Sequence, residues 1–247
     1  MTQSFRQAVH LKDYKPSSYL IDSVNLNVAI YDKYTQVNST LSLRRNPDAQ
    51  RQEPLVLDGE ALELKSIHLD GKLLPEGEYV LQNKKLIIPN LPDECELQTE
   101  VVIKPHENTA LSGLYVSKGN YCTQCESHGF QRITYYLDRP DVMATFTTRI
   151  EAKKHDYPCL LSNGNPIEKG DIGLDRHYVI WQDPFKKPSY LFALVAGDFV
   201  LDEASFITMS QPLFWGYALL AAGMAWLWVR VIKSVYRPVP MNIELLI

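Results

Sequence analysis

The sequence predicts an all-β protein, and three observations lead to that class. Apolar and polar residues alternate over short runs, as in residues 23–30, which is typical of strands with one buried face. The runs recur at intervals of roughly eight to twelve residues. Pro, Gly and Asn separate them. This pattern indicates a sandwich or barrel rather than alternating strands and helices.

The first half of the sequence predicts strands joined by short turns. Residues 23–30 and a second strand with Val37, Leu41 and Leu43 are linked by residues 31–34, which is hairpin length. Asp-Gly pairs follow two apolar runs, and such a pair is a strong hairpin signal because both positions favour positive φ. These pairs are Asp58-Gly59 after residues 55–57 and Asp70-Gly71 between residues 67–69 and 72–74. Further strands are expected at residues 79–81, 85–88 and 97–104.

The second half begins with a change of pattern. Residues 134–146 predict one or two helical turns around Pro140. Strands are expected again at residues 147–151, after the Asn163-Gly164 turn, and at residues 177–181 and 190–195. The run 190–195 is apolar on both faces, so we expect it to be a central strand.

Composition and charge exclude several classes of protein. Of 247 residues, 45% are hydrophobic and 22% charged, which is ordinary for a globular protein. The net charge of −4 gives no electrostatic argument for binding nucleic acid. Four cysteines are too few for a disulfide scaffold at this length. The first 19 residues contain no apolar core typical of a signal peptide, so we expect residues 1–210 in the cytoplasm with reduced thiols.

The composition changes at about residue 210, which divides the chain into a body, 1–210, and a tail, 211–247. Residues 213–229 carry no charge. The run 213–232 would be about 30 Å long as a helix, enough to cross a bilayer. We interpret residues 213–232 as a candidate transmembrane helix that anchors a cytoplasmic body. The alternative is a buried helix of a globular domain.

No metal or nucleophile motif stands out. The sequence contains no His-Glu-x-x-His, the usual zinc pair on a helix. Cys122 and Cys125 form a Cys-x-x-Cys pair that, with His155 and Cys159, offers four zinc ligands. A redox pair is the other functional alternative. We favour two reduced cysteines with neither role.

The block 121–142 concentrates polar and aromatic residues on a segment without strand periodicity. It includes Gln124, Glu126, Arg132 and the pair Asp138-Arg139. Such residues on irregular backbone are typical of a binding site. For Asp138 and Arg139 we favour a structural role in holding a turn.

This block, CTQCESHGFQRITYYLDRPDVMATFTTRIEA, resembles the N-terminal domain of bacterial aminopeptidase N. The resemblance extends in order through four further motifs, so that it covers about residues 8–210. These motifs are HLKDYKPSSYLI, NTALSGLY, YPCLLSNGN and WQDPFKKPSYLFALVAGDF.

The resemblance implies a large, saddle-shaped, β-sandwich-like domain that lies against a zinc-dependent catalytic domain. It also implies an exopeptidase that removes single residues from peptide N-termini. In the family, the Gln-Cys-Glu loop reaches the active site. By resemblance, Glu126 would accept the free α-ammonium of the substrate and Gln124 would line the pocket for the first side chain.

After about residue 210 the sequence departs from the family. The resemblance would require a Gly-Ala-Met-Glu-Asn segment, a His-Glu-x-x-His helix and a further Glu ligand, and this sequence has none of them. We therefore expect a truncated N-terminal domain that recognises peptide N-termini but is inactive alone. It would hold neither metal nor cofactor, since zinc belongs to the full-length family. The alternatives are a membrane-tethered β module that binds a peptide or protein, and an enzyme whose catalytic half is a separate chain.

Overall fold

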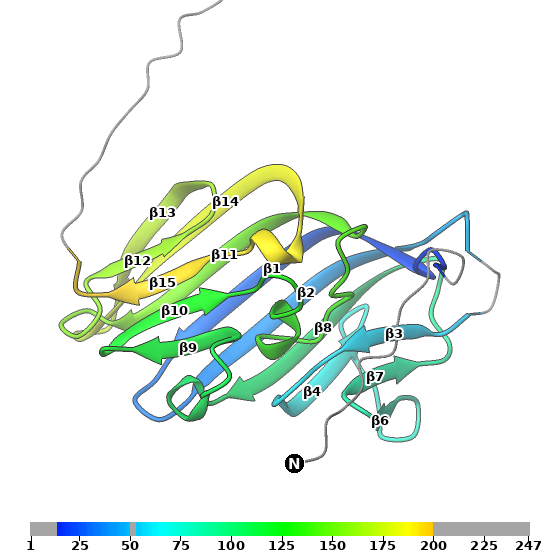
Figure 1. Cartoon of the computed structure of the whole chain (residues 1–247), viewed down its shortest axis with the longest axis horizontal. Coiled ribbons are helices and arrows are strands. Elements are labelled where there is room, and N and C mark those ends of the chain that lie inside the picture. The colour runs from blue at the N-terminus through cyan, green and yellow to red at the C-terminus, as the bar shows by residue number, and fades with distance from the viewer. Residues whose placement is uncertain (1–13, 50–52, 200–247) are drawn as a thin grey trace, which may run out of the picture. The chain divides into compact units, whose positions relative to one another are not determined.

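The computed structural model describes residues 14–49 and 53–199. Within these residues the regular structure is almost entirely β, as the sequence predicts, and the strands form three sheets (Figure 1). The strands are β1 (Tyr19–Ile30), β2 (Thr35–Arg45), β3 (Leu55–Asp58), β4 (Glu63–Leu69), β5 (Lys72–Leu73), β6 (Val80–Gln82), β7 (Lys85–Ile88), β8 (Glu94–Ile103), β9 (Gly113–Ser117), β10 (Asn120–Gln124), β11 (Met143–Lys153), β12 (Cys159–Ser162), β13 (Asn165–Ile172), β14 (Arg176–Pro188) and β15 (Leu194–Gly197). The 3-10 helices are η2 (Pro105–Glu107), η3 (Phe130–Arg132) and η4 (Ser189–Leu191).

The largest sheet has eight strands in the order β13-β14-β11-β1-β2-β8-β4-β5. Its centre pairs β1 with β11 in parallel, with Val24 beside Phe146 and Val28 beside Ile150. Parallel neighbours need a long connection. Here the chain between β1 and β11 forms nine other strands before it returns.

A four-stranded sheet, β12-β15-β10-β9, forms a second layer over one end of the large sheet (Figure 1). The three-stranded sheet β3-β7-β6 lies toward the opposite end of the large sheet. Tyr121 of β10 and Leu194 of β15 are buried in the same apolar cluster as Val28 and Ile150 of the large sheet. The layers therefore share one core, because each sheet buries one face against the other.

An aromatic group at the centre of the core fixes the irregular segment after β10. Phe130 of η3 is fully buried. Its ring centroid lies 4.8 Å from that of Tyr136, 5.9 Å from that of Phe146 and 5.1 Å from that of Phe192, each in edge-to-face geometry. Such pairs add to the free energy gained from burial alone. Packing of Phe130 against these three rings therefore helps to hold η3 in place.

The turn predictions were right at one Asp-Gly pair and wrong at the other. Asp70 and Gly71, with φ of 50° and 76°, form the predicted two-residue hairpin between β4 and β5. Asp58-Gly59 makes no hairpin, because β3 pairs with β7 and β4 pairs with β8. A Cβ at Gly59 would lie only 2.2 Å from the ring of Tyr135, so close packing explains this glycine.

The predicted helical turns around Pro140 are also wrong. The backbone of Tyr136 instead exchanges hydrogen bonds of 2.7 and 3.0 Å with Asp58, and the chain at Pro140 forms a turn in which the Val142 amide donates to the Arg139 carbonyl at 3.3 Å. The single helical turn of this region is η3, and β11 already begins at Met143. The expected central strand at residues 190–195 is confirmed in part. Strand β15 lies between β12 and β10, but it begins only at Leu194, because η4 precedes it.

The tail 211–247, with its candidate transmembrane helix 213–232, lies outside the described residues. The domain boundary near residue 210 therefore stays a prediction. No helix among residues 14–49 and 53–199 has the length and apolarity needed to span a bilayer.

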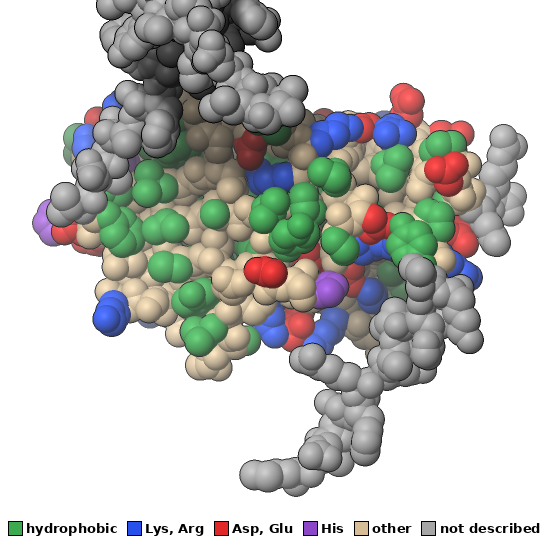
Figure 2. Space-filling model, turned by 45° about the horizontal axis from the view of Figure 1, so that its top comes forward, with side chains coloured by type: hydrophobic (Ala, Val, Ile, Leu, Met, Phe, Trp, Pro, Cys, Tyr) green, Lys and Arg blue, Asp and Glu red, His purple; other side chains and the backbone are tan. Residues whose placement is uncertain are grey.

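On the face drawn in Figure 2, apolar side chains are spread over the middle, and most charged side chains lie toward the margins. Large apolar residues that are exposed in the described part include Leu111, Met143, Phe185 and Leu191.

Candidate functional site

The two residues proposed for substrate recognition lie where β10 ends. Gln124 is the last residue of β10 and pairs with Gly113 at the start of β9. The chain then leaves the sheet in a loop, residues 124–129, in which Gln124 and Glu126 are exposed. Cys125 between them is only 3% exposed. The buried thiol side chain therefore anchors the loop and leaves its two neighbours facing solvent.

The carboxylate of Glu126 is available for a ligand. Across the part of the chain that the structure describes, no Lys or Arg forms an ion pair with it. The side-chain amide of Gln124 donates a hydrogen bond of 3.3 Å to the backbone carbonyl of Glu126. The adjoining Glu126–Ser127 peptide is cis. An exposed carboxylate of this kind can accept charge-assisted hydrogen bonds from an ammonium group.

Glycine allows the 124–129 loop to close tightly. The amide of Gly129 donates to the carbonyl of Cys125 at 2.9 Å. A Cβ at Gly129 would lie 2.4 Å from the carbonyl oxygen of Gln124 and 2.8 Å from the Cα of Cys125, which no real side chain tolerates. The loop conformation thus requires glycine at this position.

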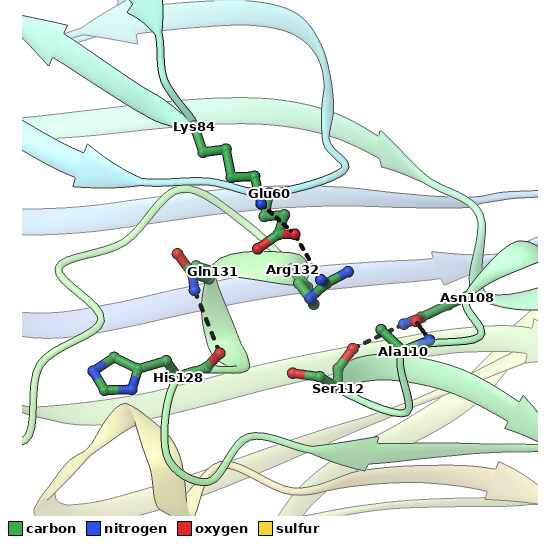
Figure 3. A network of polar contacts seen from close by, with 8 residues as sticks. All are labelled: Glu60, Lys84, Asn108, Ala110, Ser112, His128, Gln131 and Arg132. Atoms are coloured by element: carbon green, nitrogen blue, oxygen red, sulfur yellow. Dashed lines mark hydrogen bonds and ion pairs between the residues drawn. The ribbon is translucent and has the colours of Figure 1, made fainter. Parts of the chain in front are cut away.

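A second loop, residues 108–112, borders the 124–129 loop through the β9–β10 pairing. The side-chain amide of Asn108 donates to the carbonyl of Ser112 at 2.8 Å, and its oxygen accepts from the amide of Ala110 at 3.1 Å (Figure 3). The same amide also donates to the carbonyl of Leu114 at 2.9 Å. Asn commonly organises turns in this way. The motif NTALSGLY is part of the family resemblance, but this role of its first residue, Asn108, was not predicted from the sequence.

Asp138 and Arg139 hold the backbone behind the site, in agreement with the structural role favoured for them. Asp138 is 2% exposed and accepts hydrogen bonds from the Gln131 amide at 3.1 Å and the Ser189 hydroxyl at 2.7 Å. Burial raises the pKa of Asp138, and these hydrogen bonds act against that rise. Arg139 forms an ion pair with Asp141 at 2.7 Å.

The structure does not assemble the four candidate zinc ligands. Among residues 14–49 and 53–199, no three His, Cys, Asp or Glu side chains are grouped so that they could hold a metal ion. The His155 side chain is exposed beside Asp156, and the Cys125 side chain is buried. Burial raises the pKa of Cys122. Burial, with a smaller contribution from Asp138, raises that of Cys125 to about 12. Thiols with raised pKa values are weak nucleophiles and weak metal ligands at neutral pH.

Iodoacetamide is therefore expected to modify Cys125 at least a hundredfold more slowly in the native chain than in the denatured chain. A rise in pKa from 9.0 to about 12 lowers the thiolate fraction at pH 8 by roughly a thousandfold, and burial limits access further. Mass spectrometry of the alkylated peptides after timed labelling would measure both rates. Equal rates, or a Cys122–Cys125 disulfide after mild oxidation, would contradict this expectation.

Comparison with known proteins gives matches over most of the described residues. The family model for the peptidase M1 N-terminal domain matches residues 15–191. The aminopeptidase N of Caulobacter vibrioides is 50% identical over 204 residues, which are 83% of this chain and 23% of that protein. The aminopeptidase N of Escherichia coli is 45% identical over 210 residues, 85% of this chain and 24% of that protein. The chain thus spans about a quarter of the length of the curated relatives it matches.

Solved structures show the same fold. The aminopeptidase A of Legionella pneumophila, in complex with aspartic acid, matches with a TM-score of 0.72 and 42% identity, over 76% of this chain and 22% of that one. A variant M1 zinc metallopeptidase of Deinococcus radiodurans, bound to a Tyr-Ser-Ala substrate, matches with a TM-score of 0.61 over 73% of this chain and 42% of that one. At 17% identity, the second likeness concerns the fold alone.

Proposed function

The chain belongs to the family of peptidase M1 N-terminal domains. We propose that residues 1–210 act as the N-terminal β domain of an aminopeptidase N-type zinc metallopeptidase. Their contribution is the 124–129 loop, which recognises the free amino end of a peptide. The activity of the whole enzyme is part of this proposal, because the chain spans only about a quarter of its curated relatives.

The observation that carries the proposal is the exposed carboxylate of Glu126 on a loop anchored on both sides. Glu126 accepts the α-ammonium group of the substrate through charge-assisted hydrogen bonds. Gln124 lines the space for the first side chain. A carboxylate held at a fixed distance from the scissile bond selects substrates by their charged terminus, because only those place the bond correctly. This selection would make the enzyme an exopeptidase.

We assign recognition to this domain and cleavage to another part of the enzyme. In M1 peptidases, zinc polarises the scissile carbonyl and activates a water molecule. The described residues do not fit a zinc site, since no three potential ligands are grouped among them. The apolar side chains spread over the face drawn in Figure 2 are consistent with docking of a further domain.

A chimera tests the proposal. The matching 204 residues of the Caulobacter vibrioides aminopeptidase N are replaced by the corresponding residues of this chain. We expect the chimera to hydrolyse amino-acid amides in the presence of zinc, whereas the same enzyme with those residues simply deleted should be inactive. The 247-residue chain alone, assayed with added zinc, should release no product.

Two outcomes would contradict the proposal. A chimera that folds and binds zinc but shows no turnover would exclude an N-terminal-domain role for these residues. Clear turnover by the 247-residue chain alone would show that it contains its own catalytic centre.

The alternative of a membrane-tethered module depends on residues 213–232, which lie outside the described residues. No observation in the described part favours it. A cytoplasmic location for residues 1–210 stays a prediction.

A further inference from the structure

Three hydrogen bonds converge on Glu60, in the link between β3 and β4. Its carboxylate accepts from the guanidinium of Arg132 and from the ammonium of Lys84, both at 2.7 Å (Figure 3). Its backbone amide donates to the carbonyl of Gln131 at 2.9 Å. Arg132 and Gln131 belong to η3, whereas Lys84 belongs to the turn between β6 and β7. One residue therefore ties η3 to the three-stranded sheet through both its side chain and its backbone.

Helix η3 is in turn bonded to the 124–129 loop. The Arg132 amide donates to the Gly129 carbonyl at 3.0 Å, and the Gly129 amide donates to the Cys125 carbonyl at 2.9 Å. The side-chain amide of Gln131 reaches the carbonyl of His128 at 3.4 Å. A displacement of η3 would thus be passed directly to the residues that flank Glu126.

Arg132 borders a cavity of about 490 Å³, whose wall also includes Ala61, Asn108 and Ala110. Its side chain is 20% exposed, and within the described residues the carboxylate of Glu60 is the one hydrogen-bonding partner of its guanidinium group. The ion pair with Glu60 therefore orients this group at the wall of the cavity.

Two residues with unfavourable backbone conformations lie at the wall of the same cavity or next to a residue of that wall. Six non-glycine residues in the described part have positive φ, and four of them lie in two-residue hairpin turns. The other two are Ala61, with φ of 57°, and Leu111, with φ of 52°. Ala61 follows Glu60, and Leu111 belongs to the 108–112 loop. Such conformations persist only where the surroundings determine them, and they gather at functional sites.

We propose that Glu60 is a positioning residue that sets the place of the 124–129 loop relative to the three-stranded sheet. The link to substrate binding rests on the proposed function, whereas the structural coupling does not. The coupling can therefore be measured in the 247-residue chain without any enzymatic activity.

Hydrogen exchange of the 247-residue chain tests the coupling in a Glu60→Gln variant. The amides of Gly129, Arg132 and Ile133 are the reporters, because each donates within the loop or η3. Loss of the carboxylate charge weakens both ion pairs, so we expect about three- to tenfold faster exchange at these amides. Exchange in β1 and β11 should be unchanged.

Glu151→Gln is the matched control. Glu151 pairs with Arg149 at 2.6 Å on β11, with side-chain exposures of 16% and 29%. The corresponding values for Glu60 and Arg132 are 23% and 20%. The control substitution should leave the hydrogen-exchange rates of the three reporter amides unchanged. Equal effects of Glu60→Gln and Glu151→Gln on the exchange rates of the reporter amides would overturn the proposal. It would also be overturned if Glu60→Gln accelerated exchange in β1 and β11 as much as at the reporters, because that result indicates a general loss of stability.

Two further measurements separate the coupling from the function. In a double variant, Glu60→Gln with Arg132→Gln, the reporter amides should exchange no faster than in Arg132→Gln alone, because the Glu60 carboxylate is bonded to η3 only through Arg132. Additive effects would overturn the pairing. In the chimera, Glu60→Gln should raise KM about three- to tenfold with a smaller change in kcat. An unchanged KM, alongside faster exchange in the loop, would support the coupling and contradict the proposed function of the loop.

Discussion

Replacing Glu126 by Gln in the chimeric aminopeptidase is expected to lower kcat/KM for amino-acid amides by about two to three orders of magnitude. The substitution keeps the size of the side chain but removes its charge. Charge-assisted hydrogen bonds to an enclosed ammonium group contribute about 3–4 kcal/mol, which corresponds to this factor. Steady-state kinetics at saturating zinc would measure the loss.

The same variant should lose selectivity for a free amino terminus. The unmodified chimera should prefer substrates with a free α-amine over their acetylated counterparts. Glu126→Gln should reduce that preference, because a neutral amide does not attract the positively charged ammonium group of the substrate. Glu76→Gln is a suitable control, since Glu76 is an exposed carboxylate outside the strands. Should kcat/KM fall equally in both variants, or in neither, Glu126 would not be the amine-binding group.

Phe130→Ala is expected to lower the free energy of unfolding by about 3–5 kcal/mol. Phe130 is fully buried and contacts Tyr136, Phe146 and Phe192. Truncation would therefore leave a cavity where several elements meet, and the loss of three aromatic contacts would add to the cost. Guanidinium denaturation of the 247-residue chain, followed by tryptophan fluorescence and circular dichroism, would give the change.

Phe185→Ala provides the contrast, because Phe185 is 78% exposed. This variant should change the free energy of unfolding by less than about 0.5 kcal/mol. A loss below about 1 kcal/mol in Phe130→Ala would mean that the aromatic group does not hold η3, and the account of how the 124–129 loop is supported would then be wrong.

Much of the fold could be predicted from local pattern. Alternation in residues 23–30 was sufficient to identify β1, because a period of two has a direct meaning for a strand with one buried face. Asp70-Gly71 identified a hairpin, because its residues favour positive φ wherever they occur. The same local signal failed at Asp58-Gly59, where β3 joins a partner 27 residues further along the chain.

The candidate site was only partly visible in the sequence. Gln124 and Glu126 were selected by resemblance, and the structure places both side chains in solvent at the end of β10. The residues that hold the 124–129 loop in place were not predicted from the sequence. Glu60 is 72 residues away from Arg132 along the chain, and no short motif connects them. The Asp-Gly pair that precedes Glu60 was interpreted as a hairpin turn.

The all-β class, most strands and the family resemblance could be predicted because periodicity, turn residues and ordered motifs are each recognisable within a short stretch of residues. Three features could be found only in the folded chain: the parallel pairing of β1 with β11, the packing of Phe130 among three other aromatic rings, and the contacts of Glu60 with Arg132 and Lys84. These contacts depend on where distant segments meet after collapse, and many pairings of similar strands satisfy the same local pattern.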